Sequence, residues 1–187
     1  MERLKKHILG VIPFSDGEIE LLEGVCAPIA VCKGDVLLRE GDTAHRLYFV
    51  EKGLLLGRVN REGRDVVNWF ADEDDFATSM YSFISRRPAN ESIEALEDSE
   101  LYMITYDDLQ MLYRRSANFE RLGRLLTEKD YIQLEERALI LQCSSARERY
   151  ALFLEKEPDL YHRISLGLLS SYLGISQETL SRIRSKR

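Results

Sequence analysis

Four polar side chains near the C-terminus have the types and spacing that can read nucleic-acid bases: Gln177, Glu178, Ser181 and Arg182. An arginine can donate two hydrogen bonds to the O6 and N7 atoms of guanine, and a glutamate can accept one from cytosine N4. Residues three and four apart share one face of a helix, so these side chains would project together. The spacing predicts a base-reading surface, while the alternative role of Glu178 is that of a first-turn acid that stabilises its helix.

The residues around this surface have the sequence pattern of a helix-turn-helix. Leu173 belongs to the inner face of a first helix, and Gly174 marks the corner, where a positive φ costs glycine little. Ser176 is the predicted N-cap of the second helix, and Leu180 with Ile183 would hold that helix down. In such a motif the second helix enters the DNA major groove and its early residues meet base edges.

The distribution of charge favours a nucleic-acid partner over an ordinary helical hairpin. Residues 163–187 contain five basic side chains and one acidic one, a net charge of +4, whereas the whole chain carries −6. Residues 1–162 therefore carry −10, and an acidic body with a basic tip suits a protein that meets phosphate at one end only. We expect phosphate contacts from Arg184, Lys186 and Arg187.

The rest of the chain must position this tip. Short apolar runs separated by glycine and aspartate turns fill residues 29–106 and predict an antiparallel barrel or sandwich. Ser15 and Glu18 have the spacing of a capping box that starts a short helix over 15–26. After residue 105 the apolar spacing is helical to the end, including a helix over about 145–156 before Pro158.

One long helix is predicted over residues 117–142, which contain no proline and a single glycine. Its apolar residues fit a heptad seam that Lys129 and Glu136 interrupt. The helix either packs on its own barrel or forms a dimer interface. We favour the dimer, because a lone helix-turn-helix usually needs a two-fold partner to bind DNA well. The seam consists of Leu122, Leu125, Ile132 and Leu139.

These elements predict an α+β fold in three parts. The first is an antiparallel β-barrel or jelly roll with an N-terminal helix over residues 1–115. The second is the long dimerisation helix over 116–143, and the third is a DNA-binding helix-turn-helix domain over 144–187.

Composition excludes several other classes of protein. No stretch approaches the roughly 20 apolar residues that a membrane span needs, and no cleavage site follows the short apolar run near the start, so the cytoplasm is the expected compartment. The cysteines Cys26, Cys32 and Cys143 form no CxxC pair, so we expect no metal site. There is no Ser-His-Asp pattern and no glycine-rich phosphate loop, so an enzyme is not expected.

The order of these elements resembles the Crp/Fnr transcription regulators. The segments over 33–42 and 47–53, KGDVLLREGD and LYFVEKG, look like the opening of that family's cyclic-nucleotide-binding fold. Asp75 with Phe76, followed by 92–99, matches its second half. The similarity covers roughly 15–187 and is greatest to short members without a β-wing, for which weaker DNA affinity is expected. It implies that Glu178, Ser181 and Arg182 read bases, with Gln177 contacting a base or a phosphate.

The resemblance also identifies where a cyclic nucleotide would bind, and the residues there differ. The family uses a Gly-Glu pair for the ribose and an Arg-Ser or Arg-Thr pair for the cyclic phosphate. A neutral side chain cannot replace an arginine on an anionic phosphate, so cAMP is not expected in the usual mode. The corresponding positions hold Thr78, Ser79, Ala89 and Asn90.

Two arginines lie close to those positions, Arg86 and Arg87. A shifted loop could recruit one of them for an anion, although we favour the interpretation that both are solvated surface charges. The family's iron–sulfur members use an N-terminal cysteine cluster, which Cys26 and Cys32 alone do not supply. No heme ligand is identified either, so the sequence predicts no cofactor and leaves the effector open.

The sequence thus predicts a homodimeric, DNA-binding transcription regulator that an unknown effector tunes at a non-standard pocket. Its partners would be double-stranded DNA, a second copy of the chain and, for an activator, RNA polymerase. The alternative is a small-molecule sensor or interaction module with the same fold and a vestigial DNA-binding tip.

Overall fold

Two compact units make up the computed structural model, which describes residues 1–61 and 63–185. The first unit comprises Met1–Val59 and Trp69–Leu126, and the second comprises Asn60–Asn68 and the chain from Thr127 onward. The boundary between them falls inside the longest helix, α5 (Ala117–Cys143). No helix in the described part of the chain is long and apolar enough to cross a membrane.

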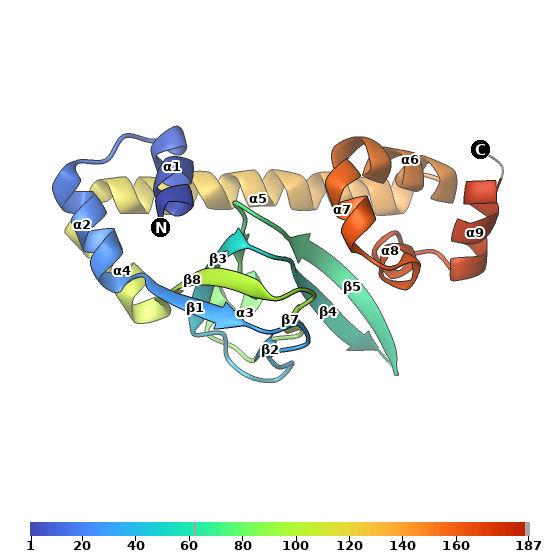
Figure 1. Cartoon of the computed structure of the whole chain (residues 1–187), viewed down its shortest axis with the longest axis horizontal. Helices are drawn as coiled ribbons and strands as arrows, with labels where there is room; N and C mark the ends of the chain where they lie inside the picture. Colours follow the sequence, from blue (N-terminus) through green and yellow to red (C-terminus); the bar gives the residue numbers. More distant parts are fainter. Residues whose placement is uncertain (62, 186–187) are drawn as a thin grey trace. The chain divides into compact units, whose positions relative to one another are not determined.

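The strands form two four-stranded sheets, in which every pairing with a described register is antiparallel (Figure 1). One sheet has the order β1 (Ala27–Val31), β8 (Ser99–Thr105), β3 (Arg46–Lys52), β6 (Phe76–Ala77). The other has the order β2 (Val36–Leu38), β7 (Ser92–Ala95), β4 (Leu55–Arg61), β5 (Arg64–Ala71). The predicted mixed fold with antiparallel sheets is confirmed, and closure into a barrel stays a prediction.

Strand β3 serves two separate hydrophobic cores because successive side chains point to opposite faces of a sheet. Tyr48 and Val50 pack in a cluster with residues of the strands β4, β7 and β8. Phe49, between them, packs instead with Leu112 and Ile8, which come from helices. These helices are α1 (Glu2–Val11) and α4 (Tyr106–Arg115), and α2 (Asp16–Val25) contributes to the same cluster.

Most of the predicted helices are present. The structure contains α2, α4, α5 and α6 (Ala146–Lys156) close to their expected positions, and Ser15 and Glu18 form the predicted capping box. The sequence pattern missed α1 and two short helices, α3 (Met80–Ser85) and α7 (Pro158–Arg163). α6 ends at Lys156, before Pro158 as expected, and Pro158 then begins α7, where its missing N–H costs nothing because the first turn leaves that group unpaired.

The carboxylate of Glu18 connects α2 to the junction of α4 and α5. It accepts hydrogen bonds from the Ser15 backbone N–H at 2.8 Å, from the Ser116 hydroxyl and from Asn118 Nδ2 at 3.0 Å. These donors, Ser116 first, lower the pKa of Glu18 from 4.5 to about 2. The carboxylate form is therefore stabilised by folding.

We expect Glu18→Gln to lower the urea midpoint of the first unit at pH 7, because a neutral amide replaces a charged acceptor. A depressed folded-state pKa contributes stability above the unfolded value of about 4.5 and loses it as the pH falls through about 2. The difference in urea midpoint between Glu18→Gln and wild type should therefore shrink as the pH falls from 4.5 to 2. Glu20→Gln, an exposed site on the same helix, is the control, and a gap that stays constant over this range would contradict the assignment.

Candidate nucleic-acid interface

Two short helices at the C-terminal end, α8 (Leu166–Tyr172) and α9 (Gln177–Ser185), meet at a tight corner (Figure 1). Gly174 has a φ of +65°, the left-handed conformation that glycine adopts at little cost. The Ser165 hydroxyl accepts from the Leu168 N–H at 3.2 Å and caps α8. The Ser176 hydroxyl accepts from the Thr179 N–H at 3.2 Å and caps α9. The corner and cap therefore have the local geometry that the sequence predicts.

Leucines bury the inner side of both helices. Leu169, Leu173 and Leu180 are exposed to only 1%, 4% and 1%, and Ile183 is half-buried. Since the apolar face of α9 is turned inward, its polar face is turned to solvent.

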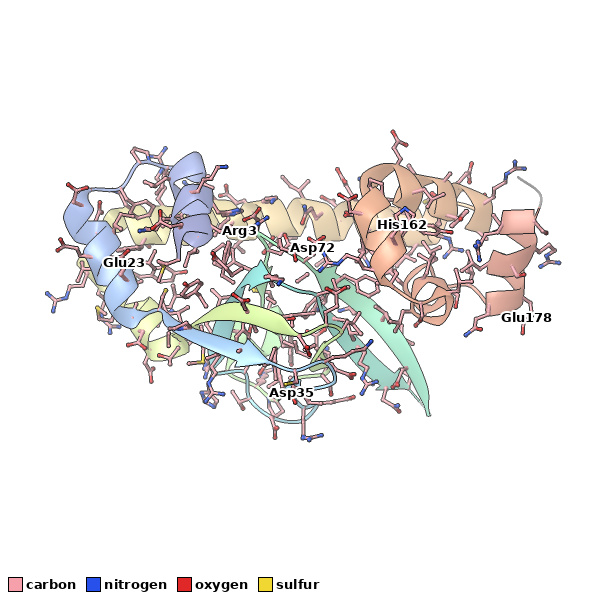
Figure 2. All side chains as sticks on the ribbon, viewed as in Figure 1. Arg3, Glu23, Asp35, Asp72, His162 and Glu178 are labelled. Atoms are coloured by element: carbon pink, nitrogen blue, oxygen red, sulfur yellow. The ribbon has the colours of Figure 1, made fainter. Side chains whose placement is uncertain are left out.

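The predicted base-reading residues lie on this exposed face: Gln177, Glu178, Ser181 and Arg182 are all exposed, as is Arg184. Glu178 lies on the first turn of α9 (Figure 2), and a hydrogen bond from the Ser176 hydroxyl lowers its pKa. Gln177 packs close to α8, since a Cβ added at Gly167 would lie 3.0 Å from its Nε2 atom. Lys186 and Arg187, predicted phosphate contacts, lie outside the described residues.

Two arginines that the sequence analysis missed hold the corner from neighbouring helices. Arg137 of α5 donates to the Tyr172 carbonyl at 3.0 Å, and its guanidinium lies 3.8 Å from the centre of the Tyr172 ring. Arg149 of α6 donates to the Leu173 carbonyl at 2.8 Å. The last carbonyls of a helix have no partner within it, so these cations supply one and also favour the negative end of the helix dipole.

Ser171, also missed, joins α8 to the tip of the hairpin formed by β4 and β5. The Val67 N–H donates to the Ser171 hydroxyl at 2.9 Å, and that hydroxyl donates to the Asp65 carbonyl at 3.0 Å. Strand β5 is the edge of its sheet, so the hydroxyl pairs backbone groups that face away from β4. The serine and the hairpin are 104 positions apart, and no local pattern in the sequence connects them.

Three of the four residues at the predicted nucleotide positions are buried in the fold, and two of them bond its backbone. The Thr78 hydroxyl donates to the Arg46 carbonyl at 2.8 Å. Ser79 is completely buried and its hydroxyl oxygen has no partner in the described structure. Ala89 is buried, with its N–H bonded to the Asp42 carbonyl at 2.8 Å. Asn90 is exposed.

Arg86 differs from the favoured sequence interpretation, because it is not a solvated surface charge. Its guanidinium donates to the carbonyls of Ala44 at 2.7 Å and Phe83 at 3.0 Å, and lies 2.9 Å from His45 Nδ1. It also lies 4.0 Å from the centre of the Tyr106 ring. Arg86 thus fixes the loop after α3, whereas Arg87 is exposed as expected.

A buried carboxylate follows directly after Asn90. Glu91 is only 5% exposed and accepts from Trp69 Nε1 at 2.9 Å. The Trp69 ring lies against Gly57, where an added Cβ would be 2.2 Å from its Cε2 atom. These contacts bury the Glu91 side chain in the strand-rich unit, directly after the predicted nucleotide positions. Among the described residues, no group of His, Cys, Asp or Glu could hold a metal ion.

The predicted seam on α5 divides into two parts. Leu122 is 8% exposed and belongs to the core of the first unit, and Leu125 packs against that core. Leu122 therefore has little surface left for a second chain, because the first turns of α5 cover the helical cluster of its own chain. Farther along, Ile132 and Leu139 are 57% and 56% exposed.

Comparisons with known proteins agree with this architecture. Residues 28–116 match the family model of the cyclic nucleotide-binding domain. The anaerobic regulatory protein of Bacillus subtilis is 27% identical over 125 residues, which are 65% of this chain and 52% of the relative. The chain thus matches about half the length of that curated relative.

Solved structures show the same fold at low sequence identity. FixK2 from Bradyrhizobium japonicum matches with a TM-score of 0.76 and 21% identity over 87% of this chain and 84% of its own. The c-di-GMP responsive global regulator CLP of Xanthomonas campestris matches with 0.72 and 23% over 92% and 91%. A Crp/Fnr family regulator from Eubacterium rectale matches with 0.73 and 18% over 91% and 82%. The Bacillus subtilis relative and the second and third of these structures are named as regulators, and they support the resemblance to Crp/Fnr regulators.

We expect Arg149→Met to loosen the corner between α8 and α9, because the Leu173 carbonyl loses a charged donor. The free energy of local opening, measured by hydrogen exchange of the α8 and α9 amides, should fall by about 1–2 kcal/mol. Arg147→Met, at an exposed site of the same helix, should change it by less than about 0.5 kcal/mol. Equal effects of the two substitutions would show that the contact with Leu173 does not hold the corner.

Proposed function

We propose that this chain is a sequence-specific, DNA-binding transcriptional regulator that acts as a homodimer in the cytoplasm. The observation that carries the proposal is the exposed polar face of α9, with Glu178, Ser181 and Arg182 together above the buried leucines. A net charge of +4 from residue 163 to 187, on a chain of −6, places the phosphate-attracting charge at the same end of the sequence.

In the proposed interface, side chains on the early face of α9 read bases. Arg182 donates two hydrogen bonds to a guanine, Glu178 accepts from a cytosine, and Ser181 can bond to either kind of base edge. Gln177 lies beside α8 and is suited to a phosphate as well as a base. The remaining basic residues add affinity through phosphates without sequence information: Arg184, Lys186 and Arg187.

The proposed dimer uses the exposed part of α5. Ile132 and Leu139 lie seven residues apart, and Tyr131 and Leu134 beside them are 65% and 62% exposed. So many large apolar side chains on a solvated helix favour a partner surface. A two-fold axis along α5 would pair two copies of α9, which must reach successive major grooves about 34 Å apart.

The strand-rich domain is proposed to sense an effector other than a cyclic nucleotide bound in the usual mode, or to act as a rigid scaffold. Ala89 stands where a cyclic phosphate would need a cation, and its side chain supplies none. We propose no cofactor, iron–sulfur cluster or heme. An effector would act by binding one arrangement of the paired α9 helices better than another, and an activator would also contact RNA polymerase.

The test of DNA reading is selection from genomic fragments, followed by affinity measurements on the enriched site. Arg182→Ala should weaken binding about 10- to 100-fold and relax the preference at one base pair. Arg184→Ala should weaken binding to all DNA sequences alike. It should also reduce by about one the slope of the logarithm of the binding constant against the logarithm of the salt concentration.

A two-fold enriched site supports the dimeric regulator. Salt-sensitive binding without an enriched sequence would show that the C-terminal basic residues bind DNA non-specifically, and it would overturn the base-reading roles. No binding with or without a cell extract favours the alternative, a sensor or interaction module whose DNA-binding tip is vestigial.

The test of the dimer is the sedimentation of Ile132→Asp combined with Leu139→Asp. Two charges without partners in an apolar interface should raise the dissociation constant at least about a hundredfold and give a monomer. Ile132→Val with Leu139→Met keeps the face apolar and should remain dimeric. A dimer that persists in the aspartate variant would place the interface elsewhere.

A further inference from the structure

A row of hydroxyl contacts runs along the first two turns of α9. The Ser176 and Thr179 hydroxyl oxygens are 3.1 Å apart, and Arg182 Nη2 donates to Thr179 Oγ1 at 3.3 Å. These residues recur at intervals of three, which places them on one face of the helix. The same Ser176 oxygen caps the helix by accepting from the Thr179 N–H.

The chemistry of a hydroxyl allows these contacts to exist together. A hydroxyl donates one hydrogen bond and accepts two, so the Thr179 oxygen can accept from Arg182 while it is bonded to Ser176. Arginine has five N–H donors, and the contact with Thr179 occupies one of them. Arg182 can therefore donate two hydrogen bonds to a guanine while one of its other N–H groups stays bonded to the Thr179 hydroxyl.

An exposed arginine has many rotamers, and binding that requires one of them loses that freedom. A hydrogen bond already present in the free protein reduces this loss, which is the general advantage of preorganisation. Thr179 is itself half-buried at the base of the exposed face, and Arg182 is exposed above it.

We propose that Thr179 is a positioning residue that orients the guanidinium of Arg182 for base reading. This inference rests on the proposed function, since it assigns no role outside that interface. Thr179 acts through Arg182 and contributes little to affinity in its absence.

The test is a double-mutant cycle on the selected DNA site. Thr179→Val removes the hydroxyl, keeps the shape and has a similar helix propensity. It should weaken binding about fivefold, as expected for one hydrogen bond of ordinary strength, and relax the same base preference as Arg182→Ala. Thr179→Ser should restore most of the affinity. In an Arg182→Ala background, Thr179→Val should have no further effect.

A second measurement needs no DNA. Relaxation of the Arg182 side-chain ¹⁵Nε in the free protein should show greater mobility in Thr179→Val than in wild type or Thr179→Ser, with unchanged far-UV circular dichroism. Unchanged mobility, or an equal affinity loss with and without Arg182, would overturn the positioning role while leaving the proposed function intact. A wild-type protein without any sequence preference would overturn the proposed function, and this inference with it.

Discussion

The bonds from two arginines to the last carbonyls of α8 are the constraint on which the exposed face of α9 depends. A helix end leaves carbonyls without partners, and at this corner the chain turns immediately at Gly174 instead of continuing the ladder. Arg137 and Arg149 supply the missing donors from two different helices. α9 starts three residues after the turn glycine. Its direction therefore depends on a corner that Arg137 and Arg149 hold in place through the Tyr172 and Leu173 carbonyls.

Charge divides the chain into regions that favour different partners. The acidic residues concentrate before position 163, and the net positive charge lies after it. In the strand-rich unit, Glu91 is buried and accepts a hydrogen bond from Trp69. Arg86, close in sequence to the predicted nucleotide positions, donates to backbone carbonyls and lies beside His45. The four predicted nucleotide positions thus hold no cationic side chain, while α9 presents Arg182 and Arg184 to solvent.

The features that sequence reasoning predicts are those whose signal is local. A capping box needs two residues three apart, and the Ser15–Glu18 pair is present as expected. The corner at Gly174 and the cap at Ser176 are equally local, as is the absence of proline that predicts α5. The helices α1 and α3 were not predicted, because neither begins at a residue whose side chain caps it.

The features that escaped prediction depend on partners far apart in the chain. Trp69 and Glu91 are separated by 22 positions, Arg86 and His45 by 41, and Ser171 and Val67 by 104. Each bond joins residues that no short-range spacing in the sequence relates, so nothing in their local pattern marks the contact. The interpretation of Arg86 as a solvated charge failed for this reason.

The apolar residues of α5 show why a repeat in the sequence does not identify a single surface. Leu125, Ile132 and Leu139 follow one another at seven-residue intervals, yet Leu125 packs with Leu122 in the core of its own chain while Ile132 and Leu139 are exposed. Exposed side chains of this size lose about 1.5–3 kcal/mol each relative to burial. Because the intramolecular core ends near Leu126, where the first unit ends, the exposed remainder of the helix is the part whose apolar character the fold of one chain leaves unexplained. A second copy of the same helix offers the complementary surface, since a two-fold contact pairs each patch with itself.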